Sequence, residues 1–193
     1  MTGSDTGWAG RLLITGATGG MGQTCALLAA ARGYDLVLAD LSQDKLDALA
    51  DRCSCDGVSV SSHVLDVTRA ESRDRLVTAL DQTGGLDALI HTVGLSPQMA
   101  DWTQIIDVDL VSTVALLEQL RPGLNDGGCV LSIASMSGYL CPPDPEIEQL
   151  LAEPLADDFS VRLQELARAK PLLENAGLAY AYSKKAVSYT HLT

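Results

Sequence analysis

The segment RLLITGATGGMG, at residues 11–22, joins a short apolar run to a cluster of glycines. The apolar run is too short for a helix, whereas residues 20–32 are rich in Ala and Leu at helical spacing. The segment therefore predicts a strand, a tight glycine turn and a helix. Such a turn presents the backbone N–H groups of a helix N-terminus to an anion.

The rest of the chain repeats this alternation of strand and helix. Further strands are predicted at residues 36–39, 58–65, 86–92 and 129–134. Ser42 and a capping box at residues 68–71 are expected to begin two of the helices between them, and residues 101–120 form a longer one. The alternation predicts an α/β fold, a Rossmann-type doubly wound parallel sheet with the strand order 3-2-1-4-5. We expect residues 1–193 to form a single NAD-binding Rossmann domain.

Composition excludes several function classes. The 193 residues carry 13 Lys and Arg against 25 Asp and Glu, a net charge of −12, which disfavours nucleic acid and anionic membranes as partners. No run approaches the roughly 18 apolar residues of a membrane span, and residues 1–10 do not resemble a signal peptide. The five irregularly spaced cysteines indicate free thiols in the cytoplasm, and they predict no metal site.

The glycine turn has the features of a dinucleotide site. Gly16 lets the chain turn off the strand, Gly20 lets the backbone approach a pyrophosphate, and Gly22 lets the helix pack closely on the sheet. The alternative, a flexible turn without a ligand, is disfavoured because the glycines lie at the first strand-to-helix junction. The residues expected to contact the cofactor here are Gly16, Thr18, Gly19, Gly20, Met21 and Gly22.

Two aspartates follow predicted strands. Asp40 ends the second strand, where a carboxylate accepts both hydroxyls of an adenosine ribose and repels a 2′-phosphate. Neither Thr18 nor Leu41 supplies a positive charge, so NAD(H) is favoured over NADP(H). Asp66 and Val67 end the third strand and are expected to meet the adenine. The open alternative is a helix-capping or solvated aspartate for Asp40 and a plain strand-end aspartate for Asp66.

Tyr180 and Lys184 form the candidate catalytic pair. At positions i and i+4 of a helix their side chains share one face. A free phenol has a pKa near 10. For acid–base catalysis at pH 7 its environment must lower this pKa by roughly 3 units, which corresponds to about 4 kcal/mol in favour of the phenolate. The lysine and a cationic nicotinamide ring could supply this, so that Tyr180 exchanges a proton with the substrate oxygen. Tyr182 lacks a lysine at i+4, and a surface aromatic beside a solvated charge is the alternative for the pair.

With these motifs in this order over residues 11–187, the sequence resembles the short-chain dehydrogenase/reductase family. The resemblance implies an NAD(H)-dependent oxidoreductase that interconverts a secondary alcohol and a ketone. It also implies that Ser135 hydrogen-bonds the substrate oxygen beside Tyr180 and that Lys184 holds the nicotinamide ribose. Ser132 and Ser137 compete with Ser135 for this role.

The chain departs from the family pattern after the fourth predicted strand. The family's Asn-Asn-Ala-Gly is His91-Thr92-Val93-Gly94 here. Gly94 can still pass close to the cofactor, whereas His91 is expected to be a packed strand-end histidine. Asp109 stands where the family has an asparagine that orders a water beside the lysine. We hypothesise that Asp109 supports this water chain and, when ionised, weakens the electrostatic help that Lys184 gives to Tyr180.

Residues 139–176 interrupt the alternation and are predicted to be a helical insertion. Its apolar residues fall at helical spacing in two groups, which predicts a pair of helices that forms either a surface hairpin or a lid over the pocket. A similar insertion followed by Leu-Ala-Tyr-Ala is familiar from bacterial 3α-hydroxysteroid dehydrogenase/carbonyl reductase-like members of the family. This resemblance implies a bulky alicyclic or steroid-like alcohol or ketone as substrate.

Family members continue beyond the catalytic helix to further strands, so we expect a truncated chain with residues 188–193 outside the fold. The resemblance implies a homodimer or homotetramer at full length. Two alternatives remain open: a catalytically inactive dinucleotide-binding fragment, and a nucleotide-sugar epimerase of the extended branch.

Overall fold

The computed structural model describes residues 10–189, apart from the side chain of Tyr189. The chain divides into two compact units. Unit 1 comprises Met1–Thr92 and Leu120–Ser132, and unit 2 comprises Val93–Gln119 and Ile133–Thr193. That residues 1–193 form a single domain stays a prediction.

Unit 1 contains a five-stranded parallel sheet in the order β3-β2-β1-β4-β5, which confirms the predicted fold class and strand order. In the register of the sheet, Thr15 pairs with Ala39 on one side and with His91 on the other, so these three strands end at the same level. The glycine turn therefore leaves the sheet between Asp40 and Thr92. The strands are β1 (Arg11–Thr15), β2 (Asp35–Asp40), β3 (Val60–Val64), β4 (Leu86–His91) and β5 (Leu124–Ser132).

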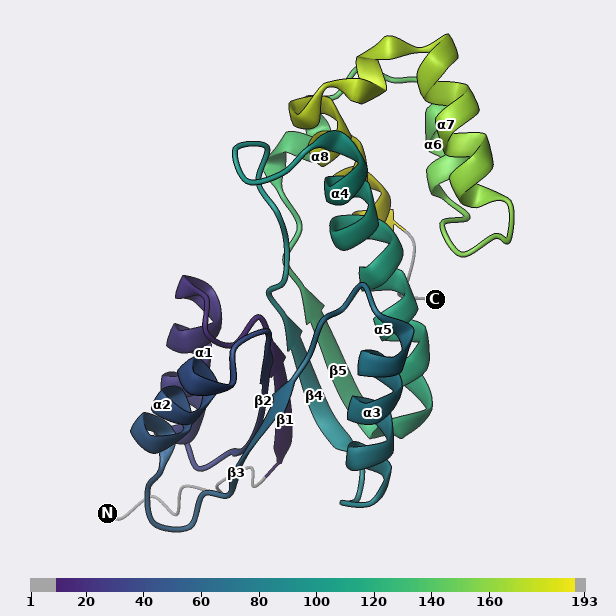
Figure 1. Cartoon of the computed structure of the whole chain (residues 1–193). Coiled ribbons are helices and arrows are strands. Elements are labelled where there is room, and N and C mark those ends of the chain that lie inside the picture. The colour runs from purple at the N-terminus through teal and green to yellow at the C-terminus, as the bar shows by residue number, and fades with distance from the viewer. Residues whose placement is uncertain (1–9, 190–193) are drawn as a thin grey trace. The chain divides into compact units, whose positions relative to one another are not determined.

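Three α-helices of unit 1 cover this sheet: α1 (Gly20–Ala30), α2 (Gln43–Cys53) and α3 (Ala70–Asp81). Figure 1 shows α1 and α2 together on one side of the strands and α3 on the other, as right-handed crossovers require. Alternate residues of β1 and β2 pack against α1 and α2 in one core cluster, and Leu12, Ile14, Leu36 and Leu38 are all buried there. A 3₁₀ turn, η2 (Arg121–Gly123), precedes β5.

Two local predictions in unit 1 are wrong. Arg69, not Thr68, occupies the cap position of α3, and its side chain makes no cap hydrogen bond. The reason is a competing turn, because the amide and hydroxyl of Thr68 both donate to the carboxylate of Asp66. Ser42 occupies the cap position of α2, as predicted, although its side chain makes no cap hydrogen bond. The fifth strand begins at Leu124, five residues before the predicted start.

Unit 2 is helical. The predicted helix at residues 101–120 is one helical run with a π turn in its middle: α4 (Trp102–Ile106), η1 (Asp107–Ser112) and α5 (Thr113–Leu120, whose last residue belongs to unit 1). Asp101 and Gln104 form the capping box that begins it. After the 3₁₀ turn η3 (Met136–Tyr139) come α6 (Pro145–Leu151), α7 (Phe159–Ala169), the turn η4 (Pro171–Glu174) and α8 (Ala176–Tyr189). Ser188 and Tyr189 thus continue α8 rather than begin a tail, and residues 190–193 lie outside the described residues.

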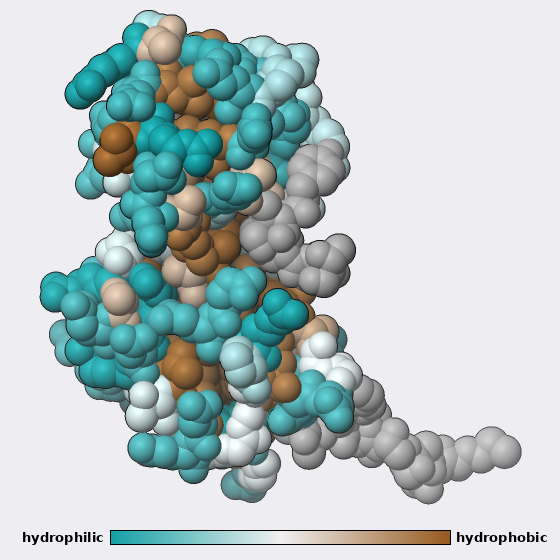
Figure 2. Space-filling view, turned by 90° about the vertical axis from the view of Figure 1, so that its right-hand side faces the viewer, coloured by the Kyte–Doolittle hydropathy of each residue, from teal (hydrophilic) through white to brown (hydrophobic). Residues whose placement is uncertain are grey.

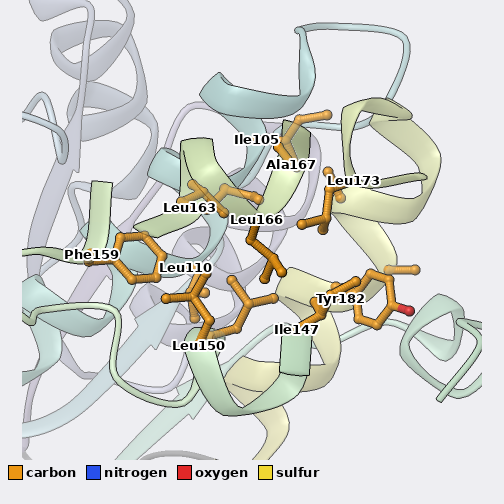
Figure 3. Packing of buried hydrophobic residues seen from close by; sticks show 14 of the residues in the cluster. Ile105, Leu110, Ile147, Leu150, Phe159, Leu163, Leu166, Ala167, Leu173 and Tyr182 are labelled. Carbon is orange, nitrogen blue, oxygen red and sulfur yellow. The ribbon is translucent and has the colours of Figure 1, made fainter. Parts of the chain in front are cut away.

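The insertion supplies much of the core of unit 2. Its two predicted helices exist as α6 and α7, and all the apolar residues predicted for them are buried except Leu155. Figure 3 shows how side chains from α4, η1, α6, α7, η4 and α8 meet in one cluster. The labelled residues are Ile105, Leu110, Ile147, Leu150, Phe159, Leu163, Leu166, Ala167, Leu173 and Tyr182.

The surface is mostly hydrophilic on the face that Figure 2 shows, where apolar residues appear between charged and polar ones. Among the helices formed by residues 10–189, none is long and apolar enough to cross a bilayer.

Candidate active site

The glycine turn of unit 1 is closely packed on its own helix. Gly16 has a φ of 71°, a left-handed conformation that favours glycine, and its carbonyl oxygen accepts from the amide of Gly19 at 3.0 Å. A Cβ atom at Gly22 would overlap that same carbonyl oxygen, whereas a Cβ at Gly20 would meet nothing within 4 Å. Gly22 therefore has the close-packing role predicted for it. Gly19, the cap residue of α1, provides no side chain to bond the first amides of the helix.

Side chains from two neighbouring elements hold this turn. Gln23 Nε2 donates to the carbonyl of Thr18 at 2.6 Å. From the end of β4, the hydroxyl of Thr92 donates to the carbonyls of Thr15 at 2.9 Å and Gly16 at 3.1 Å. His91 Nδ1 lies 2.6 Å from the hydroxyl of Thr15, and both side chains are buried. The residues at 91 and 92 thus brace the turn from the neighbouring strand, a role that sequence reasoning missed.

The carboxylate of Asp40 is oriented by backbone amides. One oxygen accepts from the amide of Thr18 at 2.8 Å and the other from the amide of Leu41 at 2.7 Å. Asp40 therefore lies against the glycine turn, as its place at the end of β2 predicted. Asp66 forms a turn with Thr68, and Val67 is buried, while the contact of these two residues with an adenine stays a prediction.

Helix α8 brings Tyr180 and Lys184 together in unit 2. The Lys184 ammonium lies 5.7 Å from the centroid of the Tyr180 ring, so the two side chains share a face of the helix. Lys184 is buried, with 6% of its surface exposed, and its ammonium lies 3.4 Å from the carbonyl of Ile133.

Asp109, in the π turn η1, lies beside Lys184. Its Oδ2 is 3.3 Å from the Lys184 ammonium, and its Oδ1 accepts from the amide of Leu95 at 2.6 Å. Asp109 has no exposed surface, and burial raises the pKa of its carboxyl group, although Lys184 and the Leu95 amide oppose this shift. Gly94 completes the group, because a Cβ there would lie 3.1 Å from the Lys184 ammonium. Asp109, Lys184 and Gly94 therefore lie together. The sequence predicted that Asp109 and Lys184 would be close to each other.

Ser135 precedes the turn η3, which leads into the insertion. Its Oγ accepts from the amide of Ser137 at 3.2 Å and lies 3.1 Å from the Ser137 hydroxyl. Ser132, the first competitor, ends β5 in unit 1. Ser135 borders a small cavity of about 150 Å³, which is lined by Ser135, Gly138, Tyr139, Cys141, Lys185 and Ser188.

No three His, Cys, Asp or Glu side chains within residues 10–189 are grouped so that they could hold a metal ion.

A family profile described as "short chain dehydrogenase" matches residues 11–143, which include both the glycine turn and Asp109. The chain belongs to the short-chain dehydrogenase/reductase (SDR) family. Tyr180 and Lys184 lie beyond the matched residues, so their assignment rests on their spacing and their geometry.

SDR relatives with curated descriptions include the human "Dehydrogenase/reductase SDR family member 2, mitochondrial", 31% identical over 66% of this chain and 49% of the relative. The "Very-long-chain 3-oxoacyl-CoA reductase" of Phaeosphaeria nodorum is 35% identical over 70% of this chain and 43% of the relative. The chain spans about half the length of these relatives.

Solved SDR structures share the fold. The NAD⁺-bound xylitol dehydrogenase superposes with a TM-score of 0.67 at 22% identity over 92% of this chain and 60% of that one. The alcohol dehydrogenase of Thermococcus sibiricus, in complex with 5-hydroxy-NADP, superposes with a TM-score of 0.66. It is 24% identical, and the match covers 92% of this chain and 66% of that one. These neighbours include both an NAD⁺ complex and a complex with an NADP derivative.

Proposed function

We propose that the protein is an NAD(H)-dependent oxidoreductase that interconverts a secondary alcohol and a ketone. The observation that carries the proposal is the buried Lys184 beside Asp109, one helical turn from Tyr180, in a chain of the SDR family. Unit 1 carries the residues suited to the cofactor, and unit 2 carries those suited to proton transfer.

The glycine turn fits a dinucleotide. The absence of a side chain at Gly22 lets α1 pack against Gly16, and the first amides of α1 have no side-chain cap, so they are suited to a pyrophosphate. The Asp40 carboxylate, fixed by two amides, suits the adenosine ribose hydroxyls and opposes a 2′-phosphate. NAD, when bound, supplies the hydride acceptor, and NADH supplies the donor.

The residues of unit 2 would move the proton. Tyr180 gives a proton to the ketone oxygen in reduction and removes it from the alcohol in oxidation. The Lys184 ammonium lies 5.7 Å from the centroid of the Tyr180 ring, on the same face of the helix. Ser135 donates to the substrate oxygen and orients it. In the free protein its hydroxyl donates to Ser137 Oγ at 3.1 Å, and it would exchange this bond for one to the substrate oxygen.

Asp109 would balance the charge of Lys184. The carboxylate pairs with the ammonium and also holds the backbone of Leu95, so it fixes the position of the lysine. An ionised Asp109 would also weaken the help that Lys184 gives to Tyr180. The variant Asp109→Asn should therefore shift the acidic limb of the pH–rate profile, and an unchanged limb would contradict this role.

A bulky alicyclic or steroid-like alcohol or ketone is our proposed substrate class, on the resemblance of the insertion. We propose a cytoplasmic location, because all five cysteines are unpaired, as in a reducing compartment. A homodimer or homotetramer is our proposal for the assembled protein, on the resemblance to the family.

A second candidate function is a dinucleotide-binding fragment without turnover. It would rest on the glycine turn and Asp40 of unit 1 alone. Such a chain would bind the cofactor through unit 1 but would not reduce a ketone.

Fluorescence titration with NADH, and separately with NADPH, tests the cofactor proposal. We expect NADH to bind more tightly than NADPH. The variant Asp40→Ala should weaken NADH binding and reduce the preference for NADH over NADPH. Equal binding of both cofactors would contradict the role of Asp40. Turnover of alicyclic ketones with NADH, lost in Tyr180→Phe, would then separate the oxidoreductase from the inactive fragment.

A further inference from the structure

Tyr182 is the aromatic residue of α8 that the catalytic proposal does not use. Residues at i and i+2 do not share a helix face, so Tyr182 points away from the face that carries Tyr180. Its ring is 1% exposed, and its hydroxyl donates to the carbonyl of Pro142 at 2.6 Å. Figure 3 shows the ring near Ile147, with its oxygen directed away from the apolar cluster. Burial raises the pKa of Tyr182, which keeps the phenol in the protonated form that can donate.

The acceptor of this bond belongs to the segment that carries Ser135. Residues 135–142 run from Ser135 through η3 to Pro142, and two contacts bind this segment to α8. At Gly138, a Cβ would lie 3.0 Å from the amide nitrogen of Lys185, so the segment and the helix backbone are in close contact. At Pro142, the carbonyl accepts from Tyr182. Between them, the buried thiol of Cys141 donates to the carbonyl of Gly138 at 3.2 Å.

The inserted helices keep Tyr182 in place. Ile147 and Leu150 of α6 belong to the cluster in which the ring is buried. Glu148, on the same helix, accepts from the ammonium of Lys185 at 2.7 Å. Because Pro142 lies just before α6, which begins at Pro145, the insertion holds both the donor and the acceptor of the phenol bond.

We infer that Tyr182 is a positioning residue, whose hydroxyl, held by the inserted helices, keeps the Ser135 segment against the catalytic helix. This inference rests on the proposed function, because the substrate contact of Ser135 belongs to that proposal. The insertion then acts as a brace for Ser135 rather than as a lid. Loss of the phenol oxygen leaves the packing of the ring intact but frees the Pro142 end of the segment.

The buried thiol of Cys141 allows the segment to be followed without turnover. In Tyr182→Phe, alkylation of Cys141 by iodoacetamide, followed by peptide mass spectrometry, should be about 2- to 13-fold faster, the range expected for the loss of one hydrogen bond. Cys53, buried in unit 1, is the internal reference, and its rate should not change. The matched control is Tyr34→Phe, since the Tyr34 hydroxyl makes no hydrogen bond within residues 10–189. Gly138→Ala, which presses on the Lys185 backbone, should also speed Cys141 alkylation.

Kinetics then test the connection to Ser135. Tyr182→Phe should lower kcat in the wild-type background but not in a Ser135→Ala background, because the hydroxyl acts through Ser135. An unchanged Cys141 rate in Tyr182→Phe would overturn the inference, and so would an equal loss of kcat in both backgrounds. If the wild-type chain shows no turnover, the proposed function fails, whereas the alkylation rates still decide whether Tyr182 holds the segment.

Discussion

The carboxylate of Asp109 and the ammonium of Lys184 lie 3.3 Å apart, and both side chains are buried. Within residues 10–189, Asp109 Oδ2 has no well-formed hydrogen bond, so the lysine charge is what balances it. Removing both charges from water is costly, and such a pair is weak evidence for stability. The proposed role of Lys184 explains this pair better than a contribution to the free energy of unfolding does.

The pH dependence of stability should reveal this cost. Because burial raises the pKa of Asp109, the folded state holds the proton more tightly than the unfolded state does. The contribution of Asp109 to the free energy of unfolding is greatest below pH 3.8, the ordinary pKa of the carboxyl group. It declines as the pH rises through the raised pKa of the folded state. The stability of Asp109→Asn relative to wild type should therefore increase with pH across this window, by at most about 1.4 kcal/mol per unit. Urea unfolding between pH 4 and 7 measures it, with the exposed Asp126→Asn as control. Parallel curves would contradict the prediction.

Two glycines of the cofactor turn should respond differently to the same substitution. Gly22→Ala places a Cβ against the carbonyl of Gly16 and should destabilise the fold by about 1–3 kcal/mol. Gly20→Ala meets no atom within 4 Å and should change stability by less than about 0.5 kcal/mol. Thermal and urea unfolding of the two variants decide the matter, and equal losses would be evidence against the packing role of Gly22.

The brace from β4 can be tested at Thr92. Thr92→Val keeps the shape of the side chain but removes the donor to the carbonyls of Thr15 and Gly16. We expect a loss of about 0.5–1.5 kcal/mol of stability and weaker NADH binding. Thr92→Ser restores the hydroxyl and should restore both properties. If Val and Ser variants bind NADH equally well, the hydroxyl does not organise the turn.

Acid should loosen the insertion. Hydrogen bonds from Lys170, with smaller help from the amides of Ile147 and Glu146, lower the pKa of Asp144. The stability this carboxylate contributes is present above its ordinary value of 3.8 and is lost as the pH falls through the lowered pKa. In acid titrations followed by circular dichroism, Lys170→Met should reduce the loss of stability at low pH. Lys45→Met on α2 should leave this loss unchanged. An unaltered acid limb in Lys170→Met would show that the ion pair contributes nothing.

What the sequence could predict follows local rules. The strand, turn and helix at residues 11–30 and the shared face of Tyr180 and Lys184 depend on spacing along one segment, and both are found. Right-handed crossovers restrict the strand order to a few possibilities, and the order 3-2-1-4-5 predicted from them is found. These features need no knowledge of distant residues.

Contacts between distant segments could not be predicted. The Thr15–His91 and Tyr182–Pro142 bonds join residues 76 and 40 positions apart, and no periodicity reports them. The capping box expected at residues 68–71 fails because Asp66 offers Thr68 a better acceptor. Asp101 and Gln104 form the capping box of unit 2 instead.

The π turn at Asp107–Ser112 limits where residues can be inserted into or deleted from the chain. Such a turn holds one residue more than a regular helical turn, and deleting that residue would rotate one end of the helix against the other by about 100°. Asp109 could not then face Lys184 while Ile105 and Ile106 kept their places in the core. Orthologues should therefore vary in length in the loop at 152–158 but keep the same number of residues between Asp101 and Leu120.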